Sequence, residues 1–231
     1  MIVVAGAARY GAVMTVYDAA RLNMVESQLR PNRVTDERLL AAFLRIRREL
    51  FVPETLRGVA YIDDNLPLGG GRYLMTPMVA AGLIQAAAVL PQDSALVIGA
   101  GVGYEAAILA QLCRSVVALE ENAELARIGR SALVDHRIAS VTYVEGTLRF
   151  GHRQRAPYDL ILFAGAAAAI PPEIKAQLGE TGRIAVVLQH QECVGQATLL
   201  AQTGGGIAPR GIFDAAAPLL PGFGADPGFV F

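Results

Sequence analysis

The fold of this chain is decided by Val97-Ile98-Gly99-Ala100-Gly101-Val102-Gly103-Tyr104. A short apolar run at residues 95–98 leads into three closely spaced glycines, and a helical pattern over residues 104–112 follows. Glycines at a strand-to-helix turn let the backbone bend sharply and let a ligand approach it closely. The stretch therefore predicts a nucleoside-binding loop between a strand and a helix.

The spacing of these glycines indicates which kind of nucleoside the loop is expected to bind. The dinucleotide fingerprint has the spacing G-x-G-x-x-G, and its third position here is Tyr104, which is too bulky for close approach of a pyrophosphate. The observed spacing is G-x-G-x-G, which favours one nucleoside with an amino-acid tail, as in S-adenosylmethionine, over NAD or FAD. The cofactor-binding residues expected in the loop are Gly99, Ala100, Gly101, Gly103 and Tyr104.

Acidic residues follow the next two apolar runs. Glu120 lies 21 residues beyond Gly99, and a carboxylate at the tip of that strand can accept hydrogen bonds from both ribose hydroxyls. Glu121 is adjacent and could substitute for it, and an acidic helix start is the alternative interpretation of both residues. Glu145-Gly146 follows the third run, where an acidic residue can receive the adenine amino group.

Short apolar runs alternate with amphipathic stretches along most of the chain. This rhythm predicts an α/β, Rossmann-like fold with a mostly parallel seven-stranded sheet covered on both faces. The expected strands are residues 95–98, 115–119, 141–144, 160–163, 184–188, 197–202 and 206–213. The expected helices are residues 17–30, 35–46, 75–89, 104–112, 122–133 and 171–178. Only turns separate the last strands, so the sheet should finish antiparallel.

The chain is expected to form one structural domain overall. Residues 1–92 should be a helical and loop region packed on a core of residues 93–221, with a flexible tail at residues 222–231. Thr35 is the expected N-cap of the second helix, and residues 51–73 should be an irregular connector with one exposed loop, because they contain two prolines and three consecutive glycines. Residues 1–13 lack a basic signal-peptide region. They read as a loose extension, with Met14 as an alternative natural start.

Composition excludes several classes of partner. Of the 231 residues 53% are hydrophobic, and only 18% are charged, against roughly 25% in an average soluble protein. The longest apolar stretch, residues 160–170, is about half of the ~20 residues that a membrane-spanning helix needs, so no membrane partner is expected. The net charge of −1 argues against a nucleic-acid partner. Arg45, Arg47 and Arg48 are interpreted as a solvated helix end. The low charge also allows self-association as a homodimer.

The cysteines and histidines form no catalytic or metal-binding constellation. Cys113 and Cys193 are far apart and flanked by apolar residues, which favours buried free thiols in the cytoplasm over a disulfide or a metal site. His136, His152 and His190 are scattered and read as surface or structural residues. No metal is expected.

Several segments, taken in order along the chain, resemble one enzyme family. In the N-terminal half they are Met24-Val25-Glu26-Ser27-Gln28-Leu29-Arg30, Arg48-Glu49-Leu50-Phe51-Val52-Pro53, Ala60-Tyr61 and Asn65-Leu66-Pro67-Leu68-Gly69. Further along they are residues 98–112, Glu120 followed by Glu124-Leu125-Ala126, and Pro157-Tyr158-Asp159. Over about residues 20–190 the chain resembles the protein-L-isoaspartate O-methyltransferases.

This resemblance implies a class I methyltransferase fold and S-adenosylmethionine as the cofactor. It also implies an enzyme that methylates the free carboxylate of isoaspartyl residues in damaged proteins, and so contributes to protein repair. A sulfonium is already electrophilic and a carboxylate is already nucleophilic at neutral pH, so that catalysis needs positioning and desolvation more than a base. A protein or peptide carboxylate is the expected substrate.

Two residues depart from the family pattern at functional positions. The family has Ile-Ser-x-Pro where this chain has Leu74-Met75-Thr76-Pro77, so Met75 replaces the serine and Thr76 is the nearest candidate catalytic hydroxyl. The family also has an acidic residue at the position of Val97, directly before the loop. These changes leave two alternatives open: a methyltransferase with another substrate, including a small molecule, and a non-catalytic binding protein. An NAD-linked dehydrogenase is a more distant alternative, with Tyr104 against it.

Overall fold

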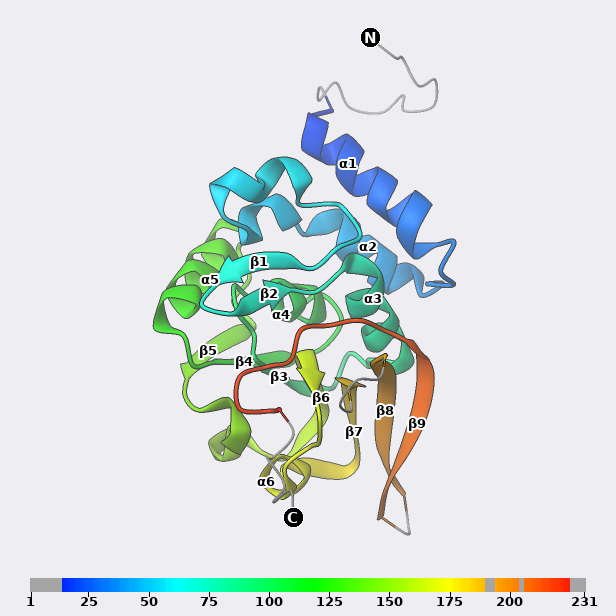
Figure 1. Cartoon of the computed structure of the whole chain (residues 1–231), viewed down its shortest axis with the longest axis vertical. Helices are drawn as coiled ribbons and strands as arrows, with labels where there is room; N and C mark the ends of the chain where they lie inside the picture. The colour runs from blue at the N-terminus through cyan, green and yellow to red at the C-terminus, as the bar shows by residue number, and fades with distance from the viewer. Residues whose placement is uncertain (1–13, 190–193, 204–205, 225–231) are drawn as a thin grey trace, which may run out of the picture.

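The central feature of the fold is a seven-stranded sheet (Figure 1). The computed structural model describes residues 14–189, 194–203 and 206–224. The strands of the sheet are β3 (Ser94–Ile98), β4 (Ser115–Glu120), β5 (Val141–Glu145), β6 (Tyr158–Ala167), β7 (Leu178–Leu188), β8 (Gln196–Thr203) and β9 (Gly206–Asp214). Their order is β5-β4-β3-β6-β7-β8-β9, parallel from β5 to β7 and antiparallel at β8 and β9. The predicted fold class, with its antiparallel finish, is confirmed.

Helices occupy most of the N-terminal part and the connections between strands. The α-helices are α1 (Val16–Met24), α2 (Glu37–Arg45), α3 (Pro77–Ala86), α4 (Tyr104–Leu109), α5 (Ala123–Asp135) and α6 (Pro172–Lys175). A π-helical turn, η1 (Val25–Leu29), continues α1, and short 3₁₀ turns are η2 (Arg48–Phe51), η3 (Glu54–Val59), η4 (Leu148–Phe150) and η5 (Arg153–Arg155). Within the described ranges, no helix is long and apolar enough to cross a membrane.

The N-cap predicted for the second helix is wrong by one residue. Asp36, not Thr35, caps α2, and its carboxylate accepts hydrogen bonds from the backbone N–H groups of Arg38 and Leu39. The Thr35 N–H instead donates to the side-chain oxygen of Gln85 on α3, 2.6 Å away. The Asp36 N–H donates to the same oxygen at 3.1 Å, so one side chain of α3 holds the backbone of both residues that precede α2.

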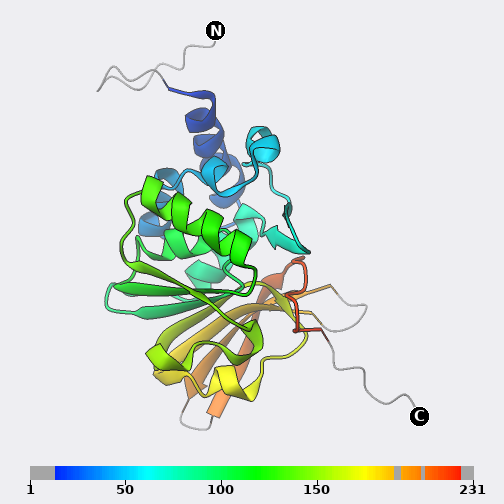
Figure 2. The ribbon, with the colours of Figure 1, turned by 90° about the vertical axis from the view of Figure 1, so that its left-hand side faces the viewer.

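The sheet separates two apolar layers. Alternate residues of the central strands face opposite sides, as the two-residue period of a strand requires. Val97 belongs to the layer that includes residues of α1 to α5, whereas Leu96 and Ile98 belong to the layer that includes Ile174 of α6 and Leu220. Figure 2 shows the N-terminal helices and α5 on one side of the sheet and α6 on the other.

A small hairpin occupies part of the region predicted to be an irregular connector. β1 (Leu66–Gly69) pairs antiparallel with β2 (Arg72–Leu74), and the turn between them places Gly70 and Gly71 at φ +58° and +73°. The strands are four and three residues long, and each buries alternate residues. The sequence concealed them because the first contains a proline and three consecutive glycines lie at the turn.

Residues beyond β9 return across the carboxyl end of β6 (Figure 1). The Ala166 N–H donates to the Pro218 carbonyl oxygen at 2.8 Å, and the Leu220 N–H donates to the Ala166 carbonyl oxygen at 2.9 Å. Phe223, inside the predicted tail, is buried and packs edge-to-face on Phe163 with ring centroids 5.3 Å apart. Residues 225–231 of that tail and the predicted N-terminal extension at residues 1–13 lie outside the described residues.

Arg48 corrects the interpretation of the arginine cluster. Arg45 and Arg47 are exposed, but Arg48 is completely buried. Its guanidinium donates to the carbonyl oxygens of Ala60 and Met75, both at 2.7 Å. It also lies 4.8 Å from the centre of the Tyr104 ring. The expectation of a solvated helix end is wrong for this residue because carbonyl oxygens distant in sequence supply the partners that a buried cation needs.

Candidate functional site

The glycine loop lies at a switch point of the sheet. From β3 the chain passes through α4 to β4 on one side, whereas β6 lies on the other side of β3. In open α/β sheets, ligands bind in the crevice outside the carboxyl ends of the strands at such a point. The loop begins directly after Ile98, the last residue of β3.

All three glycines of the loop have a backbone conformation that other residues rarely adopt. Gly99, Gly101 and Gly103 have φ of +70°, +54° and +86°, in the left-handed region where glycine carries no steric cost. The Ala100 N–H donates to the Leu119 carbonyl oxygen at 2.9 Å, which ties the loop to β4. The loop is therefore held through its own backbone atoms.

Glu120, at the end of β4, turns its carboxylate back onto the loop. The residue is completely buried, and its Oε2 accepts from the Gly101 N–H at 2.6 Å. Its Oε1 accepts from the backbone N–H groups of Glu121 and Asn122 at 3.1 and 3.0 Å. The predicted loop and the predicted acidic residue thus meet at one point.

The other predicted acidic residues lie along the same edge of the sheet. Glu145 is the register partner of Glu120 across β4 and β5, and the Gly146 N–H donates to the Glu120 carbonyl oxygen at 3.1 Å. The Glu145 carboxylate is partly exposed and pairs with Arg130 at 2.7 Å. Glu121 is exposed and contributes its N–H to Glu120. These residues are close together, at the ends of adjacent strands.

Tyr104 directs its ring away from the loop. The ring is fully buried and makes edge contacts with Phe43 and Phe51, with centroids 6.1 and 5.5 Å away. Burial raises the pKa of its hydroxyl, and the charge of Arg48 opposes that shift. At the loop itself, Tyr104 therefore offers its backbone and not its ring.

Met75 and Thr76, in the segment predicted to contact the substrate, differ in their capacity for hydrogen bonding. Met75 is buried with 1% of its surface exposed and presents no hydrogen-bonding side chain. The Thr76 oxygen accepts from the Val79 N–H at 3.2 Å as the N-cap of α3, and its hydroxyl can still donate its proton. Val97 is completely buried in the apolar layer that includes α4, so it brings no charge to the loop.

Arg72, on the hairpin, is a residue beside the loop that local sequence does not point to. Only 3% of its surface is exposed. Its Nη2 lies 2.5 Å from the Gly99 carbonyl oxygen and 3.2 Å from Glu120 Oε2. The one available signal was its place directly after the glycine triplet, which gives no indication that the hairpin folds onto the loop.

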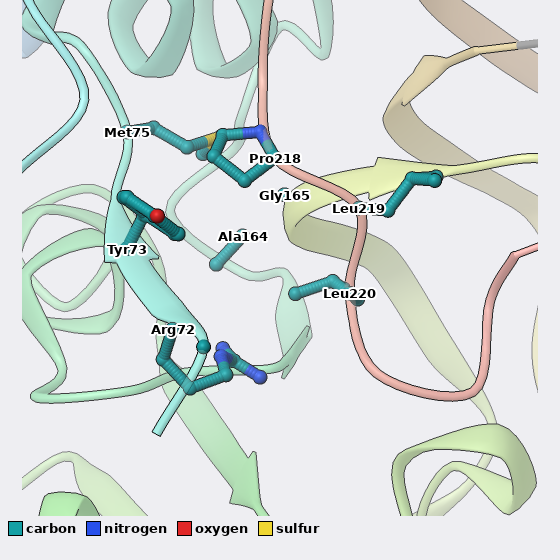
Figure 3. Close-up of a pocket in the computed structure, with 9 residues that line it drawn as sticks. Arg72, Tyr73, Met75, Ala164, Gly165, Pro218, Leu219 and Leu220 are labelled. Carbon is teal, nitrogen blue, oxygen red and sulfur yellow. The ribbon is translucent and has the colours of Figure 1, made fainter. Parts of the chain in front are cut away.

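The backbone of this site fits a nucleoside, but two side chains cover it. The three left-handed glycines and the strand-end carboxylate are what a nucleoside requires. A Cβ added to Gly99 would lie 2.8 Å from Arg72 Nη2 and 2.7 Å from Leu220 Cδ2, so both side chains fill the space above the loop. Beside them, the cavity lined by Arg72, Met75, Gly165 and Leu220 holds only about 10 Å³ (Figure 3). The backbone and the carboxylate therefore fit S-adenosylmethionine, while the side chains of Arg72 and Leu220 occupy the space next to Gly99.

The remaining cysteine and histidines lie elsewhere. Cys113 is a buried free thiol, as predicted, and burial raises its pKa to about 12. His136 stacks on Phe51 and accepts from the Arg47 N–H, and burial lowers its pKa. Burial also lowers the pKa of His152. Cys193 and His190 lie outside the described residues.

Proteins that are similar to this chain in sequence carry the name of one enzyme family. Residues 20–204 match the model of the protein-L-isoaspartate(D-aspartate) O-methyltransferase family. The protein-L-isoaspartate O-methyltransferase of Methanoculleus marisnigri is 38% identical over 75% of this chain and 79% of its own length. That of Methylorubrum populi is 38% identical over 73% of this chain and 79% of its own length.

Solved structures share the fold at lower identity. One protein-L-isoaspartate O-methyltransferase superposes with a TM-score of 0.76 at 23% identity, covering 88% of this chain and 67% of its own. A Plasmodium falciparum protein assigned to the same family was crystallised with S-adenosyl-L-homocysteine. It superposes with a TM-score of 0.73 at 16% identity, and the match covers 88% of this chain and 97% of its own. The chain therefore belongs to the protein-L-isoaspartate(D-aspartate) O-methyltransferase family, a family of S-adenosylmethionine-dependent methyltransferases, as its sequence predicts.

Proposed function

We propose that this chain transfers a methyl group from S-adenosylmethionine to the free carboxylate of isoaspartyl residues in proteins. The observation that carries the proposal is the contact between the Glu120 carboxylate and the Gly101 N–H, 2.6 Å apart at the ends of two parallel strands. It joins the two elements that a nucleoside needs in a chain that belongs to this family.

Each site residue has a proposed role in holding the cofactor. The backbone of the loop supports the amino-acid end, and its contacting residues are Gly99, Ala100, Gly101, Gly103 and Tyr104. Glu120 accepts the ribose hydroxyls, with Glu121 beside it, and Glu145-Gly146 lies where the adenine ring ends.

Methyl transfer requires mainly that the protein position the substrate carboxylate against the methyl group. S-adenosylmethionine supplies an electrophilic methyl group when it is bound. The carboxylate oxygen of the substrate forms the new C–O bond and the C–S bond breaks with its electron pair left on sulfur, so no proton is moved. Buried walls such as Met75 exclude the water that would solvate the carboxylate. Thr76 is the proposed donor of a hydrogen bond to that carboxylate.

We also propose a cytoplasmic location and, for the assembly, a homodimer. The location agrees with the free thiol of Cys113, since cytosolic proteins keep their thiols reduced. The low charge of the chain, 18% of residues, favours self-association.

The test is a methyl-transfer assay with radiolabelled S-adenosylmethionine. An isoaspartyl peptide and the same peptide with a normal aspartyl residue serve as substrate and matched control. The proposal expects a base-labile methyl ester on the isoaspartyl peptide alone. Equal or absent labelling of both peptides, with protein that binds S-adenosylhomocysteine, would contradict the isoaspartyl specificity.

A second candidate keeps the cofactor and changes the substrate. Met75 stands where the family has a serine, and a hydrogen-bond donor lost from a binding site costs about 1–3 kcal/mol. A small-molecule carboxylate held by other contacts would tolerate this change. Transfer to such a molecule, without transfer to the isoaspartyl peptide, distinguishes this candidate from the first.

A further inference from the structure

The side chain of Arg72 makes an unusual pair of contacts for a residue next to a nucleoside site. Its Nη2 donates to the Gly99 carbonyl oxygen at 2.5 Å and lies 3.2 Å from Glu120 Oε2. Both side chains of the ion pair are buried, with 3% and 0% exposed. Nη1 is also buried and has no hydrogen-bond partner among the described residues. A guanidinium is therefore desolvated here with one of its donors unused, which is costly.

The carboxylate of Glu120 keeps one acceptor site beyond its backbone hydrogen bonds, and Arg72 lies beside it. A carboxylate offers about four lone-pair sites. Backbone N–H groups of Gly101, Glu121 and Asn122 use three of them. The Arg72 guanidinium forms an ion pair with the carboxylate, with Nη2 3.2 Å from Oε2. The three backbone donors belong to the loop and the strand end, so the arginine is the partner that can leave by a side-chain rotation.

The arginine also takes up space above the loop. A Cβ at Gly99 would come within 2.8 Å of Arg72 Nη2 and within 2.7 Å of Leu220 Cδ2. The cavity beside the loop, lined by Arg72, Met75 and Leu220 among others, holds about 10 Å³, so little open space remains on this side of the loop. In Figure 3, Arg72 closes one end of the pocket, while Met75 and Pro218 lie at the other.

The charge of the pocket is altered as well. Valine at position 97 brings no charge to the loop, and the charge of Arg72 cancels that of Glu120 within their buried ion pair. S-adenosylmethionine carries one net positive charge, from a sulfonium, an ammonium and a carboxylate, while S-adenosylhomocysteine lacks the sulfonium and is neutral overall. A nearby buried cation therefore disfavours the first ligand more than the second.

We propose that Arg72 is an internal competitor for the cofactor site and sets its selectivity by charge. The guanidinium occupies the acceptor site on Glu120 that a ribose hydroxyl would use, so a nucleoside binds only when Arg72 leaves. The residue thereby weakens binding of both ligands, and of the cationic one more. This inference rests on the proposed function, because it takes the nucleoside site as given.

The test measures the Kd of S-adenosylmethionine and of S-adenosylhomocysteine by calorimetry for the wild-type chain and Arg72→Gln. The variant should bind S-adenosylhomocysteine about tenfold more tightly, as expected when a charge-assisted contact no longer has to be broken. The Kd of S-adenosylmethionine divided by that of S-adenosylhomocysteine should also fall in the variant, because the charge that repels the sulfonium is gone. The matched control is Arg127→Gln, which removes an exposed arginine paired with Glu124 on α5 and should leave both Kd values unchanged.

Two further variants keep the test decisive if Arg72→Gln folds poorly. Arg72→Lys keeps the charge but loses the planar guanidinium, so both Kd values should lie below the wild-type values. The Kd of S-adenosylmethionine divided by that of S-adenosylhomocysteine should stay as high as in the wild type. Leu220→Ala opens space without changing charge and should lower both Kd values by the same factor.

The outcomes separate this inference from the proposed function. Unchanged or raised Kd values in folded Arg72→Gln would overturn the competitor role while leaving the proposed function intact. A wild-type ratio of the two Kd values that persists in this variant would overturn the charge selectivity. If no variant binds either ligand, both the inference and the proposed function are contradicted.

Discussion

The Tyr143 hydroxyl donates a hydrogen bond to the carbonyl oxygen of Gly101, 3.0 Å away, so a side chain of β5 fixes the middle of the glycine loop. The tyrosine is mostly buried, and burial raises the pKa of its hydroxyl above the ordinary value. The hydroxyl therefore stays protonated and able to donate. A residue two strands away from the loop thus becomes part of its support.

Tyr143→Phe should loosen the loop without removing the ring that packs beside it. The expected result is a loss of about 1 kcal/mol in the free energy of unfolding, the usual contribution of one hydrogen bond, together with weaker binding of S-adenosylhomocysteine. Urea unfolding and calorimetry measure the two effects. Tyr158→Phe is the matched control, because its hydroxyl donates to the His152 carbonyl oxygen at 2.7 Å, away from the loop. The control should lose similar stability and keep its affinity; equal affinity in both variants would count against the loop support.

Gly103→Ala should disrupt the loop directly. Gly103 has φ +86°, and a Cβ there would lie 2.5 Å from the Tyr143 hydroxyl. Strain of this kind costs about 1–3 kcal/mol, and the same displacement should abolish binding of S-adenosylhomocysteine. Gly58→Ala provides the comparison, since a Cβ at that position would meet no atom within 4 Å. Thermal unfolding that shifts equally for the two variants would show that the loop tolerates a side chain.

Glu105 should make stability depend on pH. This residue of α4 is buried with 2% exposed, and burial raises its pKa above the ordinary value of 4.5, while the charges of Arg48 and Arg72 oppose the shift. A carboxyl with a raised folded-state pKa contributes full stability below its unfolded-state pKa and loses it as pH rises through the folded-state pKa. Glu105→Gln cannot ionise, so its stability relative to wild type should increase from about pH 5 to about pH 8.

Urea unfolding at the two pH values measures this change. Glu173→Gln, the same substitution at an exposed residue of α6, is the control for the substitution itself. A Glu105→Gln difference in stability that is the same at both pH values would contradict the role assigned to burial.

Thr76 should have two separable roles. Thr76→Val removes the oxygen that caps α3, at a cost of about 1 kcal/mol, and should lower methyl transfer further if the hydroxyl binds the substrate carboxylate. Thr76→Ser keeps the hydroxyl and should preserve both properties. Stability comes from urea unfolding and transfer from the peptide assay. Turnover that survives Thr76→Val would show that another group binds the carboxylate.

The features that depend on local sequence were predictable. Three closely spaced glycines after an apolar run specify a strand, a left-handed turn and a helix, and Glu120 follows from the length of one βα unit. The antiparallel finish of the sheet followed from the short turns near residues 196–214. Each of these inferences uses only neighbours in the chain, where conformational preference and periodicity act.

Features that depend on distant partners were not predictable. Arg48 looked like a surface charge because nothing nearby in sequence reveals the Ala60 and Met75 carbonyl oxygens that receive it. Arg72 went unnoticed because its partners, Gly99 and Glu120, lie 27 and 48 residues further along the chain. The return of the segment around Leu220 across β6 is likewise a tertiary contact. Such residues fill the site, and only the folded chain reveals them.

A crystal structure with S-adenosylhomocysteine would show whether the loop and Glu120 form a nucleoside site that Arg72 occupies when no ligand is bound. Ribose hydroxyls should lie on the Glu120 carboxylate, the loop should remain left-handed at Gly99, Gly101 and Gly103, and the Arg72 guanidinium should be turned away from Glu120. A ligand bound elsewhere, or bound at the loop with the Arg72–Glu120 ion pair still intact, would contradict this arrangement.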